Sequence, residues 1–93
     1  MQTATTLFAL SFLQRDEITE ILASAGAGAG WQAVVAGDAD GLESRFLASG
    51  AAVALIDARG ALDDGLSATR RLGGLVATNG AALLVLVSRG DVE

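Results

Sequence analysis

The most restrictive feature of this chain is a short apolar run that stops on a single acidic residue. Residues 51–56 read AAVALI, and the next residue is Asp57. A near-continuous apolar run of this length is typical of a strand that is buried on both faces of a parallel sheet. Its last residue then lies at the carboxyl edge of the sheet, where open α/β sheets bind their ligands, so Asp57 is the first candidate functional residue.

The rest of the chain alternates between strand-like and helix-like patterns. Strands are predicted over residues 5–13, 31–36, 52–56 and 82–87, the last of them fully buried. Helices are predicted over 15–25, around 42–47 and over 62–78. Strands separated by helices need right-handed crossovers, which produce a parallel sheet with helices on both faces. We therefore predict an α/β fold, a doubly wound parallel sheet of βαβαβαβ order, in a single domain over residues 1–93.

The spacing of apolar residues predicts which side of each helix is buried. The expected inward residues are Ile18, Ile21, Leu22 and Ala25 in the first helix, Leu42, Phe46 and Leu47 in the second, and Leu66, Leu72, Leu75 and Val76 in the third. The GAGAG run at 26–30 is predicted to end the first helix and to connect it to the next strand. A phosphate-binding glycine loop has the opposite order, strand before helix, so a nucleotide site is not predicted there.

Acidic residues are predicted to cap two of the helices. Asp38 or Asp40 precedes the second helix, and Asp63 and Asp64 stand at the start of the third. An aspartate at the cap position accepts a hydrogen bond from one of the unpaired N–H groups of the first turn. For Asp63 and Asp64 this structural role is preferred to metal ligation.

Charge and composition exclude several classes of function. The net charge is −5 and the chain has no lysine, which disfavours nucleic acids and anionic membrane surfaces as partners. The absence of Cys and His removes thiol chemistry and the commonest general base and metal ligand. No apolar stretch is long enough to span a membrane, and no signal peptide pattern is present, so we expect a cytoplasmic protein.

With this element order, the chain resembles the receiver domain of two-component response regulators. Asp57 stands where that family has its phosphorylated aspartate. Asp64 and Gly65 close the following loop, eight residues after the acid, at the family's spacing. Ser88 ends the fourth strand, at the position of the family's switch hydroxyl. The resemblance spans the whole chain and implies the strand order 2-1-3-4, without the family's fifth strand and last helix.

Two departures from the family concern the cations. The family's acid pair after strand one holds Mg²⁺ together with the phosphorylated aspartate, and here Ser11 and Phe12 occupy those places. A phenyl ring offers none of the oxygen ligands that Mg²⁺ requires. The family's lysine has no counterpart either. Phosphoryl transfer depends on such cations, so we predict a degenerate, truncated receiver with no metal and no cofactor, in which Asp57 is a structural carboxylate and Ser88 forms a turn.

One alternative keeps the phosphoacceptor function. If the first strand ran longer, Asp16 and Glu17 would take the place of the family's acid pair. Mg²⁺ would then be held by Asp57 with Asp16 or Glu17, and Asp57 would accept a phosphoryl group from a histidine kinase. Both interpretations remain open from the residues alone.

The resemblance implies a regulatory role rather than catalysis. We predict a phosphorylation-independent, receiver-like interaction module of a bacterial signal-transduction protein, not an enzyme, which binds protein partners or its own output domain. The resemblance extends to N-terminal domains that precede cyclic-di-GMP enzymes with GGDEF or EAL output domains, so we expect a longer parent protein. If the chain ends at Glu93, strand four is an apolar edge without charge, and we expect a homodimer through it or through the exposed helix face. In the alternative, the parent protein continues past Glu93 and supplies the fifth strand, a last helix and an output domain.

Overall fold

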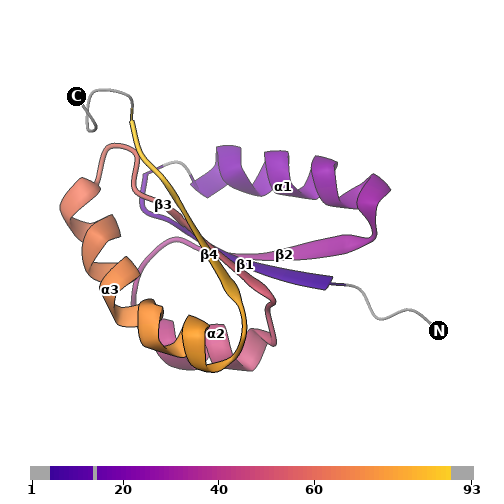
Figure 1. The fold of residues 1–93 in the computed structure, drawn as a ribbon. Helices are drawn as coiled ribbons and strands as arrows, with labels where there is room; N and C mark the ends of the chain where they lie inside the picture. Colours follow the sequence, from indigo (N-terminus) through magenta and orange to yellow (C-terminus); the bar gives the residue numbers. More distant parts are fainter. Residues whose placement is uncertain (1–4, 14, 89–93) are drawn as a thin grey trace.

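Parallel strands form one sheet with helices on both of its faces (Figure 1). This computed structural model describes residues 5–13 and 15–88. The described elements are β1 (Thr5–Ser11), α1 (Arg15–Ala29), β2 (Trp31–Ala36), α2 (Leu42–Ser49), β3 (Val53–Asp57), α3 (Leu62–Thr78) and β4 (Ala82–Leu86). The strand order is β2-β1-β3-β4, and every neighbouring pair is parallel. The predicted α/β class, βαβαβαβ order and strand order 2-1-3-4 are therefore confirmed.

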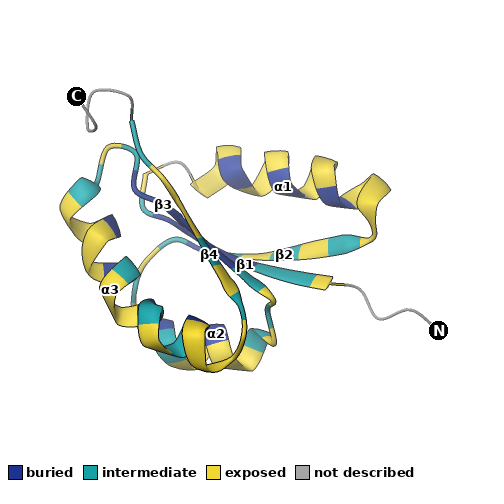
Figure 2. Ribbon diagram, in the orientation of Figure 1, coloured by how far each residue is buried: buried dark blue, intermediate teal, exposed yellow. Residues whose placement is uncertain are grey.

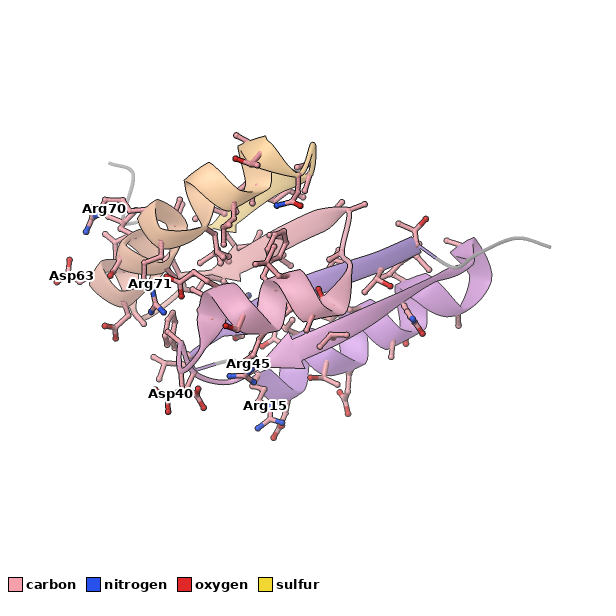
Figure 3. All side chains as sticks on the ribbon, turned by 90° about the horizontal axis from the view of Figure 1, so that it is seen from below. Arg15, Asp40, Arg45, Asp63, Arg70 and Arg71 are labelled. Atoms are coloured by element: carbon pink, nitrogen blue, oxygen red, sulfur yellow. The ribbon has the colours of Figure 1, made fainter. Side chains whose placement is uncertain are left out.

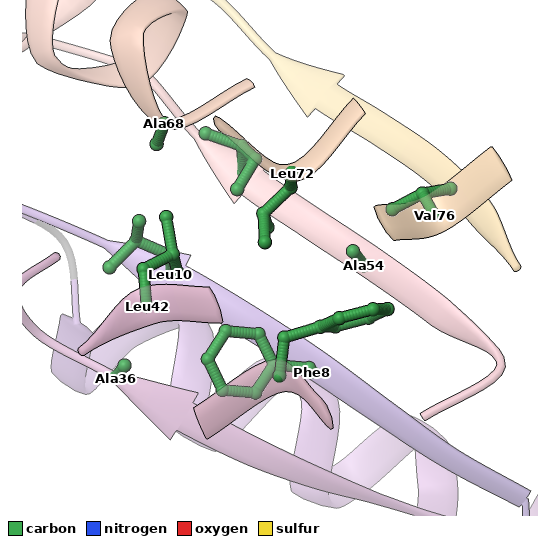
Figure 4. Close-up of a cluster of buried hydrophobic side chains, with 10 residues drawn as sticks. Phe8, Leu10, Ala36, Leu42, Ala54, Ala68, Leu72 and Val76 are labelled. Atoms are coloured by element: carbon green, nitrogen blue, oxygen red, sulfur yellow. The ribbon is translucent and has the colours of Figure 1, made fainter. Parts of the chain in front are cut away.

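The larger core lies between the sheet and the layer formed by α2 and α3 (Figure 4). Phe8 of β1 meets Phe46 of α2 edge to face, with ring centroids 6.0 Å apart and planes at 82°. Leu72 of α3 is fully buried in the same cluster. Edge-to-face aromatic pairs place the positive ring edge against the negative ring face, so this contact orients α2 on the sheet as well as burying apolar area.

A smaller core lies under α1 on the opposite face of the sheet. Ile18 and Leu22 pack there against Ala9 of β1 and Leu55 of β3. Residues 8 and 9 of β1 thus point to opposite faces, as alternation along a strand requires. Burial on both faces explains why β1 and β3 lack the polar alternation of a half-exposed strand.

Helix α1 is longer than predicted, because the glycine run continues it instead of ending it. Gly26 lies buried in the helix against the start of β2, where a Cβ would come within 2.6 Å of the Trp31 carbonyl oxygen. The glycine therefore permits a close approach between the two elements. The inward face is also narrower than predicted, because Ile21 and Ala25 are exposed.

The predicted aspartate caps are wrong. α2 follows Gly41 and α3 follows Ala61, and neither helix start has a side-chain cap. Asp38 instead accepts a hydrogen bond from the Asp40 N–H (3.0 Å) and one from Arg45 (3.2 Å), which organises the loop before α2, where Figure 3 places Asp40 near Arg45. Asp63 and Asp64 lie in the first turn of α3, where their charge still suits the helix dipole.

Two predicted core leucines also lie outside the core. Leu47 of α2 is 49% exposed and Leu66 of α3 is 39% exposed. Leu42 and Phe46 already fill the space between α2 and the sheet, and Leu72 and Val76 do the same for α3. An ion pair then ties the helices together on the outside, where Arg71 meets Glu43 at 2.6 Å (Figure 3).

The strand β4 lies at one edge of the sheet and is largely exposed, as its colours in Figure 2 show. Its predicted full burial is therefore wrong, because the described residues cover only one of its long edges and part of its faces. Other strand ends shift slightly: β1 stops at Ser11, β3 includes Asp57, and β4 stops at Leu86. In the described part of the chain, no helix is long and apolar enough to cross a membrane.

Candidate functional site

The carboxyl ends of the two central strands bring Ser11 and Asp57 together. β1 and β3 are neighbours, and their register pairs Ser11 directly with Asp57. Both side chains are buried, with 0% and 1% of their surface exposed. Asp57 thus lies at the carboxyl end of a central strand, as its place after the apolar run indicated.

Each of the two oxygens of the Asp57 carboxylate accepts two hydrogen bonds. Oδ1 accepts from the Arg59 backbone N–H at 3.2 Å and from Arg59 Nε at 2.8 Å. Oδ2 accepts from Arg59 Nη2 at 2.9 Å and from Ser11 Oγ at 3.0 Å. A carboxylate has about four lone-pair positions, so this arrangement uses its whole accepting capacity. The side-chain contact with Arg59 is bidentate, which is the strongest form of an arginine–carboxylate pair.

Arg59 connects the site to a third element. Its Nη1 lies 3.5 Å from Oε1 of Glu17, in the first turn of α1. The guanidinium therefore sits between a buried carboxylate from β3 and a half-exposed one from α1. Arg59 was not among the predicted site residues, although its position two residues after Asp57 was a usable signal. A side chain so close along the loop can fold back onto the strand end that precedes it.

The hydrogen bonds between Asp57 and Arg59 favour the charged forms of both side chains. Burial raises the pKa of the Asp57 carboxyl, but the hydrogen bonds from Arg59 and Ser11 together outweigh burial and hold that pKa below its ordinary value. The hydrogen bond with Asp57 is also the largest influence on the Arg59 guanidinium, whose pKa it raises. Asp57 and Arg59 are consequently both ionised at neutral pH.

This lowered pKa predicts how stability depends on pH. The unfolded chain has a higher Asp57 pKa than the folded chain, so the unfolded state binds the proton more readily as the pH falls. The stabilisation by ionised Asp57 is complete above its unfolded-state pKa of about 3.9 and is lost as the pH falls through the folded-state value. Urea unfolding between neutral pH and the most acidic pH at which the chain stays folded is expected to show this loss in the wild type. Asp57→Asn should lack that part of the pH dependence, and parallel curves for the two proteins would contradict the assignment.

The remaining predicted site residues lie apart from this cluster or have structural roles. Gly65 is buried where α3 lies against Ala58, the residue after Asp57, and Asp64 beside it is exposed. Ser88 follows β4 and is half-buried. Phe12, which occupies one of the family's acid positions, packs against the core under α2 and α3.

The longer first strand required by the alternative interpretation is not formed. β1 ends at Ser11, and Asp16 and Glu17 lie in the first turn of α1. Glu17 reaches the site only through Arg59. Among residues 5–13 and 15–88, no group of three or more acidic side chains is arranged to hold a metal ion.

Trp31 lies at the amino ends of the parallel strands, whereas Asp57 lies at their carboxyl ends. Trp31 begins β2 and pairs with Thr5 at the start of β1, whereas Asp57 pairs with Ser11 at the end of β1. A shallow groove of about 280 Å³ runs beside it between α1 and β2, lined by Thr19, Leu22, Ala23, Ala27, Trp31, Gln32, Ala33 and Val35. The groove and the Asp57 cluster are therefore separate features of the fold.

Comparison with known proteins adds no family assignment. The chain gives no significant match to a protein-family model, to a curated protein or to a solved structure.

Proposed function

We propose that this chain is a receiver-like regulatory module that works without phosphorylation, with Asp57 as a structural residue. The observation that carries the proposal is the complete set of hydrogen bonds on the Asp57 carboxylate. A phosphoacceptor needs one oxygen free to attack phosphorus and another free to bind a metal ion. Here Arg59 and Ser11 occupy the accepting positions of both oxygens.

The arginine also replaces the charge that a metal would supply. Phosphoryl transfer to a carboxylate requires cations at the transferred oxygens. Arg59 instead neutralises Asp57 itself, through a bidentate contact fixed by its own backbone N–H on the same oxygen. To open the site, the guanidinium would have to leave both Asp57 and Glu17, and Asp57 would lose most of its hydrogen bonds.

What remains for function is the outer surface of the module. Its helices and its exposed strand edge offer binding surfaces for a protein partner or for an output domain of the same polypeptide. By the resemblance to receiver domains alone, the proposed context is a bacterial signalling protein, with a cyclic-di-GMP enzyme as the candidate output. The module itself has no catalytic role in this proposal.

A titration with Mg²⁺ and beryllofluoride, a stand-in for a phosphoryl group, tests the proposal. We expect no saturable change in the backbone amide spectrum at Ser11, Asp57, Ala58 or Arg59 up to millimolar concentrations. Trp31 fluorescence is unsuitable as the readout, because Trp31 lies at the amino ends of the strands, away from Asp57. Asp57→Asn is the matched control for nonspecific shifts. Saturable shifts in the wild type that this variant abolishes would establish a phosphoacceptor and overturn the proposal.

A further inference from the structure

The open edge of β4 combines unpaired backbone groups with exposed apolar side chains. In the described part of the chain, β4 pairs with β3 alone. Leu84 is 55% exposed, and Val85 and Leu86 are each 37% exposed. The strand carries no charged residue and no proline, the features by which natural proteins usually protect an edge strand. Among the described residues, nothing on β4 hinders the addition of another strand at this edge.

The backbone geometry shows which groups of β4 are available. The Ala82 N–H donates to Ala52 O (3.0 Å), and Leu86 O accepts from the Ala58 N–H (2.8 Å). Both residues thus direct their backbone groups toward β3. Because successive strand residues direct these groups to alternate sides, those of Leu83 and Val85 point to the open edge.

We propose that β4 pairs with β4 of a second copy of this chain, antiparallel and centred on Leu84, to form one continuous sheet. A two-fold axis through Leu84, perpendicular to the sheet, relates the two copies. The N–H and C=O groups of Leu83 in one copy then meet those of Val85 in the other. The backbone groups that point outward are the ones this register uses, and the interface is self-complementary, as two-fold symmetry requires.

Side-chain sizes fit the same register. On the α1 face of the sheet, Leu84 meets its own symmetry mate, and Ala82 meets Leu86 of the second copy. A small side chain thus opposes a large one on each side of a central leucine pair. On the other face, Leu83 opposes Val85. Each pair is apolar, and such cross-strand pairs are the contacts that stabilise antiparallel strands.

The side of α3 next to this edge is also compatible with a second copy. Arg71 contacts Glu43 of α2, so the opposite side of α3 faces past β4. That side carries Leu66, Gly73 and Ala77 at helical spacing, and a Cβ built on Gly73 would meet nothing within 4 Å. The charged residues at the same helical spacing are Asp63, in the first turn of α3, and Arg70, one acidic and one basic. Between Leu66 and Ala77 this side of α3 therefore carries small and apolar residues with one basic residue, and it extends the surface that a second copy would cover.

The area of this surface indicates a weak dimer. A paired strand of five residues is only about 17 Å long, so we expect an interface smaller than the roughly 800 Å² per partner of a standard one. We therefore expect the two copies to associate at micromolar concentrations and to exchange. Sedimentation of the 93-residue chain should show a mass rising from 9.3 kDa toward twice that value as concentration increases.

Cysteine scanning tests the register directly, because the chain has no cysteine of its own. Leu84 forms a non-hydrogen-bonded antiparallel pair with its mate, with Cα atoms about 4.5 Å apart, which a disulfide can span. Leu83 lies diagonally from its mate, at roughly 7–8 Å, beyond easy bridging. Under mild oxidation, Leu84→Cys should form a covalent dimer in several-fold higher yield than Leu83→Cys. Leu47→Cys, at a leucine of similar exposure on α2 (49% against 55% for Leu84), gives the background from random collision.

The second test introduces a charge at Leu84, next to the two-fold axis of the proposed dimer. Leu84→Lys places two like charges directly opposite each other and should shift the mass to that of the monomer. The matched control, Leu47→Lys, should leave the association unchanged, and circular dichroism checks that both variants are folded. A wild-type monomer at high micromolar concentration, equal cross-linking at residues 84 and 47, or a dimer that survives Leu84→Lys would each overturn the proposal. These results do not depend on whether Asp57 accepts a phosphoryl group.

Discussion

Replacing Asp57 with asparagine is expected to lower the free energy of unfolding by about 2–3 kcal/mol. Asparagine keeps the size of the side chain but removes the charge, and its NH₂ group faces donors on Arg59 or Ser11. Removing one partner of a fully buried pair costs about 3–5 kcal/mol. Arg59 is 31% exposed and can turn toward water, so the loss here should be smaller.

Urea denaturation followed by circular dichroism, at one fixed protein concentration, measures this loss. Asp63→Asn is the matched control, because Asp63 is exposed in the first turn of α3. Its effect should stay within about 0.5 kcal/mol. If Asp57→Asn were as stable as the wild type, the hydrogen-bonded pair would contribute nothing to folding. The structural role proposed for Asp57 would then be wrong.

Replacing Gly65 with alanine is expected to destabilise the protein by about 2–3 kcal/mol. Gly65 lies in the first part of α3, pressed against Ala58. An added Cβ would overlap the Ala58 Cβ and come within 2.9 Å of the Ala58 Cα, which is backbone and cannot rotate away. The helix or the loop after Asp57 would have to shift, so the Asp57–Arg59 contact is expected to weaken as well.

Gly74→Ala on the same helix is the matched control for the change at Gly65. A Cβ at Gly74 meets nothing within 4 Å, and alanine is the better helix former. This variant should therefore raise the free energy of unfolding by about 0.5–1 kcal/mol. Opposite signs for the two substitutions would show that packing against Ala58 decides the Gly65 result. Equal effects would contradict that account.

The element order was predictable because it depends on local patterns. The apolar run at 51–56 indicated a buried strand, and the third helix was predicted with the bounds that the structure has, Leu62–Thr78. Helix spacing alone did not show how wide each buried face is. Ile21 and Leu47 match the helical pattern but are exposed, because the sheet contacts a narrower stripe of each helix than the pattern allows.

For the site, too, one part could be predicted from the sequence and another could not. The position of Asp57 at a strand end followed from the sequence, because an apolar run ending on an acid has few other interpretations. Its partners did not follow, since Ser11 lies on another strand and Arg59 contacts Asp57 only when the loop folds back. The resemblance to receiver domains implies acids and a lysine around the aspartate, and it gives no reason to expect an arginine in the loop.

The sequence by itself determined the alternation of strands and helices, the parallel sheet and the acid at its edge, because apolar periodicity and residue preferences act over a few neighbouring residues. Only the tertiary structure decided which groups surround that acid. Whether a buried carboxylate is free to react depends on groups that meet it in space, and Arg59, Ser11 and Glu17 come together only when α1 and the strand ends pack around one point.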